Sequence, residues 1–198
     1  MSLDDVKDKV LPRITGHVLI RDPETGEVLL NKRNAVHYEN MTLAIAYSLS
    51  GKSDGIIHKM WFGNGGCSGS QTGELTYFPT NTVDPKAHLY SPTYFKIIST
   101  SPDIVGVEKS TGNNYLEVKH LLGTVYTDIV ATCTLEYNEP AGQEVFDDSQ
   151  SNSDSFVFNE IGLMSPEGLL LTHVVFNPIQ KSLNRLIEVI YTLRIQMA

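Results

Sequence analysis

The sequence has few cysteines, no concentration of positive charge and no long apolar run. Two cysteines, Cys67 and Cys133, are too few for a disulfide framework, which favours a reducing compartment. The formal net charge is −8 and no stretch gathers lysine and arginine, so we expect no nucleic-acid partner. No apolar run approaches the roughly 20 residues that span a bilayer, and Asp4 and Asp5 stand where a signal peptide carries basic residues. We therefore expect no membrane partner and no secretion by that route.

The overall composition and the pattern of apolar residues are typical of one globular domain rich in strands. Hydrophobic residues make up 41% of the 198, enough for a sizeable core. Residues 125–136 alternate between an apolar and a mixed face, which is the period of a half-buried strand. Pro23 and Gly26 suit a turn, so "DPETGE" predicts a hairpin between strands 16–21 and 27–32. The last part of the chain predicts a meander with turns at "SPEG" and "NPIQKSLN".

Helical signals are fewer than strand signals. Residues 41–50 place apolar side chains on one face, with Asn40 as the N-cap and Gly51 as the stop. Residues 3–11 predict a short helix or an arm. About nine strands against one longer helix predict a mainly-β fold, an antiparallel β-sandwich with one packed α-helix and long loops. In this interpretation residues 1–198 form a single domain.

Two long segments show no sustained period. Residues 64–93 are rich in Gly, Ser, Thr, Asn and Pro, and residues 138–155 form an acidic segment, "NEPAGQEVFDDSQSNSDS". Loops of this length are uncommon inside a compact domain and usually serve a function. We expect segment 64–93 to become ordered by packing against another subunit, and the acidic segment to stay at the rim or face a basic neighbour. The candidate subunit-interface residues are Leu75, Tyr77, Phe78, Leu89, Tyr90 and Tyr94.

The glycine-rich stretch "MWFGNGGCSGS" at 60–70 raises the question of phosphate binding. A dinucleotide fingerprint needs Gly-x-Gly-x-x-Gly leading into a helix, but Ser68 stands in place of the third glycine and no helical pattern follows. The Gly-Lys-Ser at 51–53 lacks the upstream glycine of a Walker loop. We therefore expect these glycines to adopt positive φ at a tight turn rather than to hold a phosphate.

No catalytic or metal-binding pattern is present in the sequence. No two of the six histidines stand at metal-ligand spacing, although convergence of His58, His120 and His173 in space stays open. Cys133 lies on the apolar face of a predicted strand and reads as a core residue, whereas Cys67 is the one candidate nucleophile. We expect no catalytic residues, no cofactor and no metal site, and hence no enzyme.

Three stretches carry a resemblance to a known family. They are "GHVLIRDPETGEVLLNKRNAVHYENMTLAIAYSLSG", "IHKMWFGNGG" and "FNEIGLMSPEGLLLTHVVFNPIQKSLNRLIEVIYTLRI", within residues 15–66 and 156–196. Together they resemble virion structural proteins of tailed bacteriophages of the large marine and cyanobacterial type. The last stretch is also similar to the meander of tail-collar and tail-fibre attachment domains.

The resemblance implies a non-enzymatic structural component in the tail, neck or baseplate region of a virion. Such a protein forms a ring or anchors fibres through contacts with copies of itself and with neighbouring tail or neck subunits. It is assembled in the host cytoplasm and resides in the virion.

Two other functions stay open on the sequence alone. One is a receptor- or glycan-binding β-sandwich module of a tail fibre, because nine tyrosines and Trp61 supply surface on which sugars stack. If the protein binds glycans, replacing Tyr77 and Tyr90 is expected to abolish binding. In the alternative interpretation, these aromatic side chains anchor the long loop to its own domain or to a neighbouring subunit. The other is a thiol hydrolase that uses Cys67.

Overall fold

A computed structural model of the chain describes residues 11–70, 73–99, 110–140 and 155–197. The described part is mainly β, with one α-helix, α1 (Tyr38–Leu49), and a short 3-10 turn, η2 (Ser53–Gly55). Its strands are β1 (Pro12–Arg21), β2 (Val28–Val36), β3 (Lys59–Gly63), β4 (Cys67–Gly69), β5 (Leu75–Tyr77), β6 (Pro92–Ile97), β7 (Tyr115–His120), β8 (Tyr126–Leu135), β9 (Ser155–Met164), β10 (Leu170–Ser182) and β11 (Ile187–Met197).

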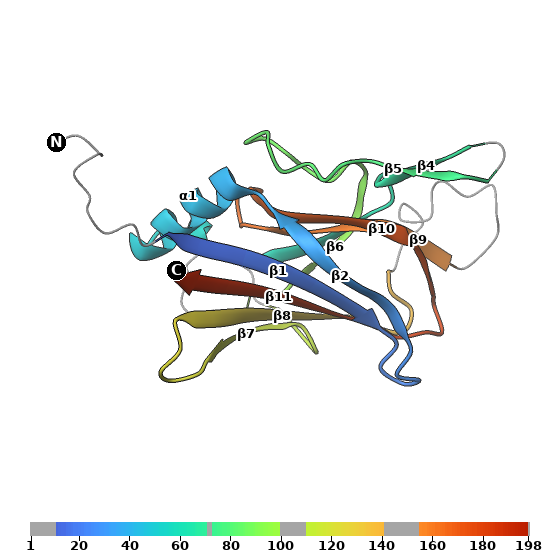
Figure 1. Cartoon of the computed structure of the whole chain (residues 1–198). Helices are drawn as coiled ribbons and strands as arrows, with labels where there is room; N and C mark the ends of the chain where they lie inside the picture. The colour runs from blue at the N-terminus through green and yellow to red at the C-terminus, as the bar shows by residue number, and fades with distance from the viewer. Residues whose placement is uncertain (1–10, 71–72, 100–109, 141–154, 198) are drawn as a thin grey trace.

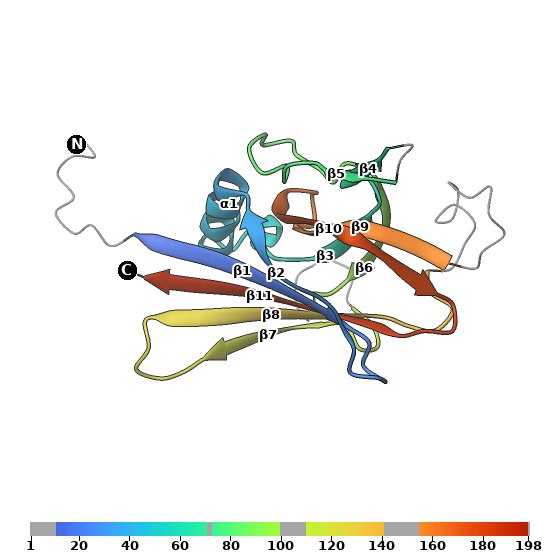
Figure 2. The same ribbon diagram turned by 45° about the vertical axis from the view of Figure 1, so that its right-hand side comes forward.

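Nine of these strands form one antiparallel sheet that curls into two layers (Figures 1 and 2). The strand order is β6-β3-β9-β10-β2-β1-β11-β8-β7. The bend lies between β10 and β2, which pair only through Thr172 with Val36 and His173 with Ala35. Strands β4 and β5 form a separate small hairpin. The expected mainly-β, sandwich-like fold is confirmed.

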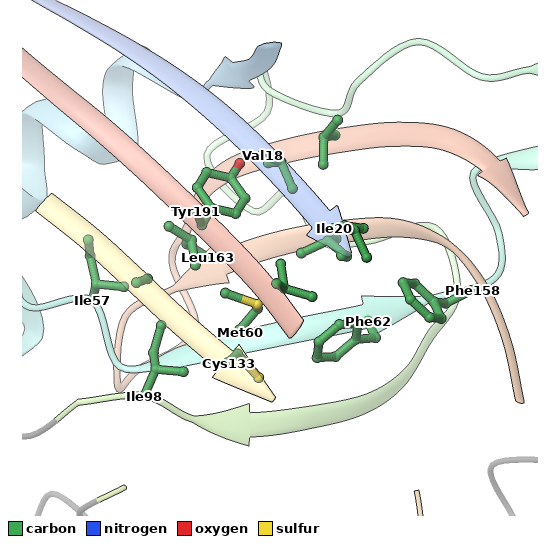
Figure 3. Packing of buried hydrophobic residues seen from close by; sticks show 14 of the residues in the cluster. Val18, Ile20, Ile57, Met60, Phe62, Ile98, Cys133, Phe158, Leu163 and Tyr191 are labelled. Atoms are coloured by element: carbon green, nitrogen blue, oxygen red, sulfur yellow. The ribbon is translucent and has the colours of Figure 1, made fainter. Parts of the chain in front are cut away.

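The main core lies between the two layers. Strand alternation turns every second side chain of β1, β8 and β11 inward, toward the opposite layer. Cys133 of β8 is fully buried there, and burial raises the pKa of its thiol to about 12, so it is the core residue that the sequence predicts. Figure 3 shows core side chains from both layers, among them Val18, Ile20, Met60, Phe62, Cys133, Phe158, Leu163 and Tyr191.

The helix starts earlier than the predicted range 41–50 because a different residue caps it. His37 is the N-cap, and its Nδ1 accepts a hydrogen bond from the backbone N–H of Asn40 at 3.2 Å. Asn40, the predicted N-cap, lies inside the helix, where its buried amide donates to the carbonyl oxygen of Leu170 at 3.0 Å. Asn40 therefore ties α1 to β10 instead of beginning the helix. The predicted helix or arm at 3–11 lies almost wholly outside the described residues.

The hairpin between β1 and β2 and the turn at "SPEG" between β9 and β10 are confirmed. The predicted turn at "NPIQKSLN" is too long, because β10 continues to Ser182 and the turn is confined to Leu183 and Asn184. The register of β10 against β9 shifts between Val175 and Ile179, and Pro178 lies within that shift. An irregularity of this kind tolerates proline inside a strand, since the proline has no N–H to pair.

Candidate functional site

The glycine-rich segment does cradle an anion, but the anion is the protein's own Glu160. This side chain of β9 is fully buried. Its Oε1 accepts hydrogen bonds from the backbone N–H groups of Gly65 at 3.1 Å and Ser91 at 2.8 Å, and its Oε2 accepts one from Tyr90 at 3.0 Å. Converging backbone N–H groups of this kind also bind phosphate in other proteins. Here an internal carboxylate already uses them.

The glycines of this segment are needed for close approach, and the prediction of positive φ is wrong. None of Gly63, Gly65 and Gly66 has a positive φ. A Cβ on Gly63 would stand 2.5 Å from the carbonyl oxygen of Ser91, and one on Gly65 would stand 2.7 Å from the backbone nitrogen of Ser91. Any larger residue would push segment 90–91 away from the Glu160 carboxylate.

His173 of β10 completes the buried cluster. Its Nδ1 accepts a hydrogen bond from the backbone N–H of Asn81 at 2.8 Å, so the ring proton belongs on Nε2. Nε2 then donates to Oε2 of Glu160 at 3.0 Å, and both side chains are fully buried. This geometry assigns a neutral imidazole beside an ionised carboxylate. Both ring nitrogens are already bonded within the protein, which leaves His173 without a free nitrogen to act as a base.

The charge on Glu160 is stabilised by its hydrogen bonds. Burial by itself would raise the pKa of Glu160. The hydrogen bond from His173 and those from the N–H groups of Ser91 and Tyr90 outweigh this effect and lower the pKa below its usual value. The cluster is therefore an internal clamp between β9, β10 and segment 78–91.

Segment 78–91 makes many contacts within its own domain, and these favour order without another subunit; packing against a neighbouring subunit stays a prediction. Besides the bonds to Glu160 and His173, the backbone N–H of Phe78 donates to the carbonyl oxygen of Gly66 at 2.9 Å. Nε2 of His37 lies 2.7 Å from the carbonyl oxygen of Asp84. Ala87 and Leu89 are buried in a second, smaller apolar cluster with Met164 and Leu170.

The six predicted interface residues separate into two groups. Leu89 is 5% exposed in the second cluster, and Tyr94 packs against the main core, where burial and the nearby Glu139 carboxylate raise its pKa to about 12. Leu89 belongs to the interior of the chain, and Tyr94 is partly buried against the core. The side chains of Leu75, Tyr77, Phe78 and Tyr90 are exposed.

The exposed side chains of Tyr77 and Tyr90 nevertheless make hydrogen bonds within the domain. The hydroxyl of Tyr90 donates to the carbonyl oxygen of Pro79 at 2.6 Å, and its ring centroid lies 5.4 Å from that of Phe78. The hydroxyl of Tyr77 donates to the side-chain oxygen of Asn177 on β10. These contacts favour the interpretation in which the aromatic residues anchor the loop to its own sandwich.

The histidines left open by the sequence do not converge. Nδ1 of His58 lies 2.8 Å from the hydroxyl of Ser99, and Nδ1 of His120 lies 2.9 Å from that of Thr127. Across residues 11–70, 73–99, 110–140 and 155–197, no group of three His, Cys, Asp or Glu side chains is placed to hold a metal ion. No helix in the same ranges is long and apolar enough to cross a membrane.

The other buried or reactive groups are also occupied by structural contacts. Cys67 is half-buried, and its sulfur accepts from the side-chain amide of Asn159 at 3.0 Å. Lys181 is fully buried, and its ammonium group donates to the carbonyl oxygens of Glu136, Glu139 and Ser182 at 2.8 to 2.9 Å. All three protons of this ammonium group are therefore used within the protein.

Sequence reasoning missed the most exposed apolar surface of the described chain. It lies at the connection between β7 and β8, where Leu122 is 89% exposed and the side chains of Val118, Leu121 and Val125 are also exposed. The end of β11 is adjacent, because the N–H of Met197 donates to the carbonyl oxygen of Val125 at 3.0 Å. Exposed Leu11 precedes Pro12, which pairs with Met197. The only signal in the sequence is the apolar pair in "HLLGTV", beside a turn glycine.

Comparisons with known proteins add no relative. No protein-family model, no curated protein and no solved structure matches the chain. The function is therefore argued from the resemblance of the three sequence stretches and from the geometry.

Proposed function

We propose that the protein is a non-enzymatic structural component of a tailed-phage virion, in the tail, neck or baseplate region, that assembles through protein–protein contacts. The observation that carries the proposal is the apolar end of the sandwich, defined by Leu11, Val118, Leu121, Leu122, Val125 and Met197. In Figure 1 the start of β1, the end of β11 and the β7–β8 connection lie at the same end of the molecule.

Single exposed apolar side chains are common, but a contiguous group of them marks an interaction surface. Burying such side chains against a partner removes apolar area from water, which stabilises the contact by about 25 cal/mol per Å². β7 is moreover an edge strand of the nine-stranded sheet, and edge strands offer backbone groups for pairing with another chain. Both features support binding of a neighbouring virion subunit to this end of the protein. That subunit is either another copy of the chain or a different tail or neck protein.

The resemblance in residues 15–66 and 156–196 supports a location in a virion. The buried Glu160–His173 pair beneath the glycine-rich segment holds a loop in place, which supports a structural role for these two titratable side chains. The predicted acidic segment, 138–155, lies mostly outside the described residues and stays a prediction.

Two measurements test the proposal. Mass spectrometry of purified particles is expected to find the chain in fixed copy number, and its absence from mature virions would overturn the idea. In phage that carry Leu122→Glu together with Val125→Glu, we expect incorporation into particles to fall sharply while the isolated protein keeps its thermal stability.

Val28→Glu is the matched control. Val28 is 56% exposed and pairs with Arg21, at the opposite end of β1 from Leu11, so the same change of apolar to acidic side chain leaves incorporation unaltered. If the double variant enters particles as well as wild type, the apolar end is not the assembly surface.

A further inference from the structure

A pocket of about 300 Å³ lies on the outer surface of the layer that contains β3, and the indole of Trp61 lines it. Trp61 points away from the main core because it alternates along β3 with Met60 and Phe62, which are fully buried. Its ring centroid lies 4.9 Å from that of Phe95 at an interplanar angle of 31°, and it packs against the second apolar cluster. Trp61 is thus an aromatic surface held in position from two sides.

The rest of the pocket combines apolar walls with a small polar rim. The walls are the side chains of Leu89, Pro92, Met164 and Pro166. The rim contains Lys59, His88 and Glu167, and the ammonium of Lys59 lies 4.8 Å from the centre of the Phe95 ring. Within the described part of the chain, the side chains of His88 and Glu167 have no hydrogen-bond or ion-pair partner.

We propose that this pocket binds one neutral sugar ring of a glycan. A pyranose has a C–H face that packs on an indole, and hydroxyl groups at its edge that both donate and accept hydrogen bonds. Glu167 accepts from a hydroxyl and Lys59 donates to one. The positive charge of Lys59 and the negative charge of Glu167 balance at the rim, which favours a neutral polar ligand over an anion or a cation.

The size of the pocket limits the ligand. Its volume is at the lower end of the range of small-molecule sites, which suits a single ring and leaves the remainder of a glycan in solvent. The exposed rings of Tyr77 and Tyr90 are less suited to stacking. The Tyr90 ring packs against Phe78, and the hydroxyls of both tyrosines are already bonded, to Asn177 and Pro79 respectively. This inference does not rest on the virion proposal, and each can fail without the other.

Trp61 is the only tryptophan of the chain, so its fluorescence reports directly on the pocket. The full-length protein is titrated with the methyl glycosides of glucose, galactose and N-acetylglucosamine. We expect a saturable change in Trp61 emission with at least one of them at millimolar concentration. Calorimetry on Trp61→Ala is expected to show no binding of that glycoside, with the circular dichroism of the fold retained.

Replacement of the two rim charges separates a sugar from a charged ligand. For a neutral ring, Lys59→Met and Glu167→Gln each weaken binding about tenfold, because each removes a hydrogen bond to a charged group. An anion would instead bind more tightly to Glu167→Gln and a cation more tightly to Lys59→Met. The matched controls Lys119→Met and Glu117→Gln remove the same charges from exposed β7 and leave the affinity unchanged.

The proposal is overturned if none of the three glycosides gives a saturable change. It is equally overturned if Lys59→Met and Glu167→Gln shift the affinity in opposite directions, or if the two β7 controls weaken binding as much as the rim variants do.

Discussion

The Oε2 atom of Glu160 lies 3.0 Å from Nε2 of His173, and both side chains are completely buried. The pair looks like part of a catalytic dyad, but the second nitrogen of His173 accepts from the backbone N–H of Asn81. The same carboxylate accepts from three further backbone N–H groups. The cluster therefore uses its charge to hold a long loop on the sandwich.

Glu160→Gln is expected to destabilise the protein by about 2–4 kcal/mol, because a buried NH₂ group would replace an oxygen that now accepts two hydrogen bonds. In either orientation of the amide, its NH₂ group faces two N–H donors: those of Gly65 and Ser91, or those of Tyr90 and His173. Urea unfolding of the variant and wild type measures the difference. Glu117→Gln, which removes an exposed carboxylate paired with Lys119, serves as the control and changes stability by less than about 1 kcal/mol. Equal stabilities of Glu160→Gln and wild type would contradict the clamp.

The clamp also predicts a loss of stability in acid. The folded pKa of Glu160 is lowered, so its contribution to stability is fully present above the unfolded pKa of about 4.3 and is lost as the pH falls through the folded value. Unfolding free energies measured from pH 7 down to pH 3 should therefore decline more steeply for wild type than for Glu160→Gln. The comparison isolates Glu160, because other carboxylates such as Asp22 and Asp128, whose pKa values are also lowered, are common to both proteins. Parallel curves would be evidence against this role.

Two glycine substitutions test whether Gly65 is needed because the backbone of segment 90–91 lies against it. Gly69, in the same glycine-rich segment, has room for a side chain and serves as the comparison. Gly65→Ala places a Cβ 2.7 Å from the nitrogen of Ser91 and 2.8 Å from Cβ of Tyr90, so we expect a loss of about 1–3 kcal/mol. At Gly69 the nearest atom to a new Cβ is 3.9 Å away, at the side chain of Leu75, and Gly69→Ala should be tolerated. Thermal unfolding of both variants tests this. The explanation fails if the two substitutions cost the same.

Hydrogen exchange of the isolated chain tests how segment 78–91 is held. The N–H groups of Asn81, Tyr90 and Ser91 donate to buried side chains, so they are expected to exchange slowly in the free protein. Exposed Val83, in the same segment, provides a fast-exchanging reference. Fast exchange at all four positions, followed by protection in particles, would support the expectation that another subunit orders this loop.

The sequence by itself determined the elements whose signals are local. The period of two in residues 125–136 and the Pro23–Gly26 turn are properties of neighbouring residues, and they correctly predicted β8 and the β1–β2 hairpin. The same holds for Cys133, which lies on the apolar face of its strand and is buried as predicted. Alternation along a strand decides which side chains face inward before any partner strand is known.

Only the tertiary structure decided which distant residues meet. Glu160, His173 and Gly65 carry no motif, because their contact depends on the register of β9 against β3 and β10 and on the return of segment 78–91 across them. The same long-range contacts explain the errors. Asn40 looked like a helix cap but bonds to β10, and Gly63 and Gly65 looked like turn residues but give room to Ser91. Local sequence reports the backbone preferences of a few residues, whereas a close approach between segments as much as 130 positions apart is set by how the whole sheet curls.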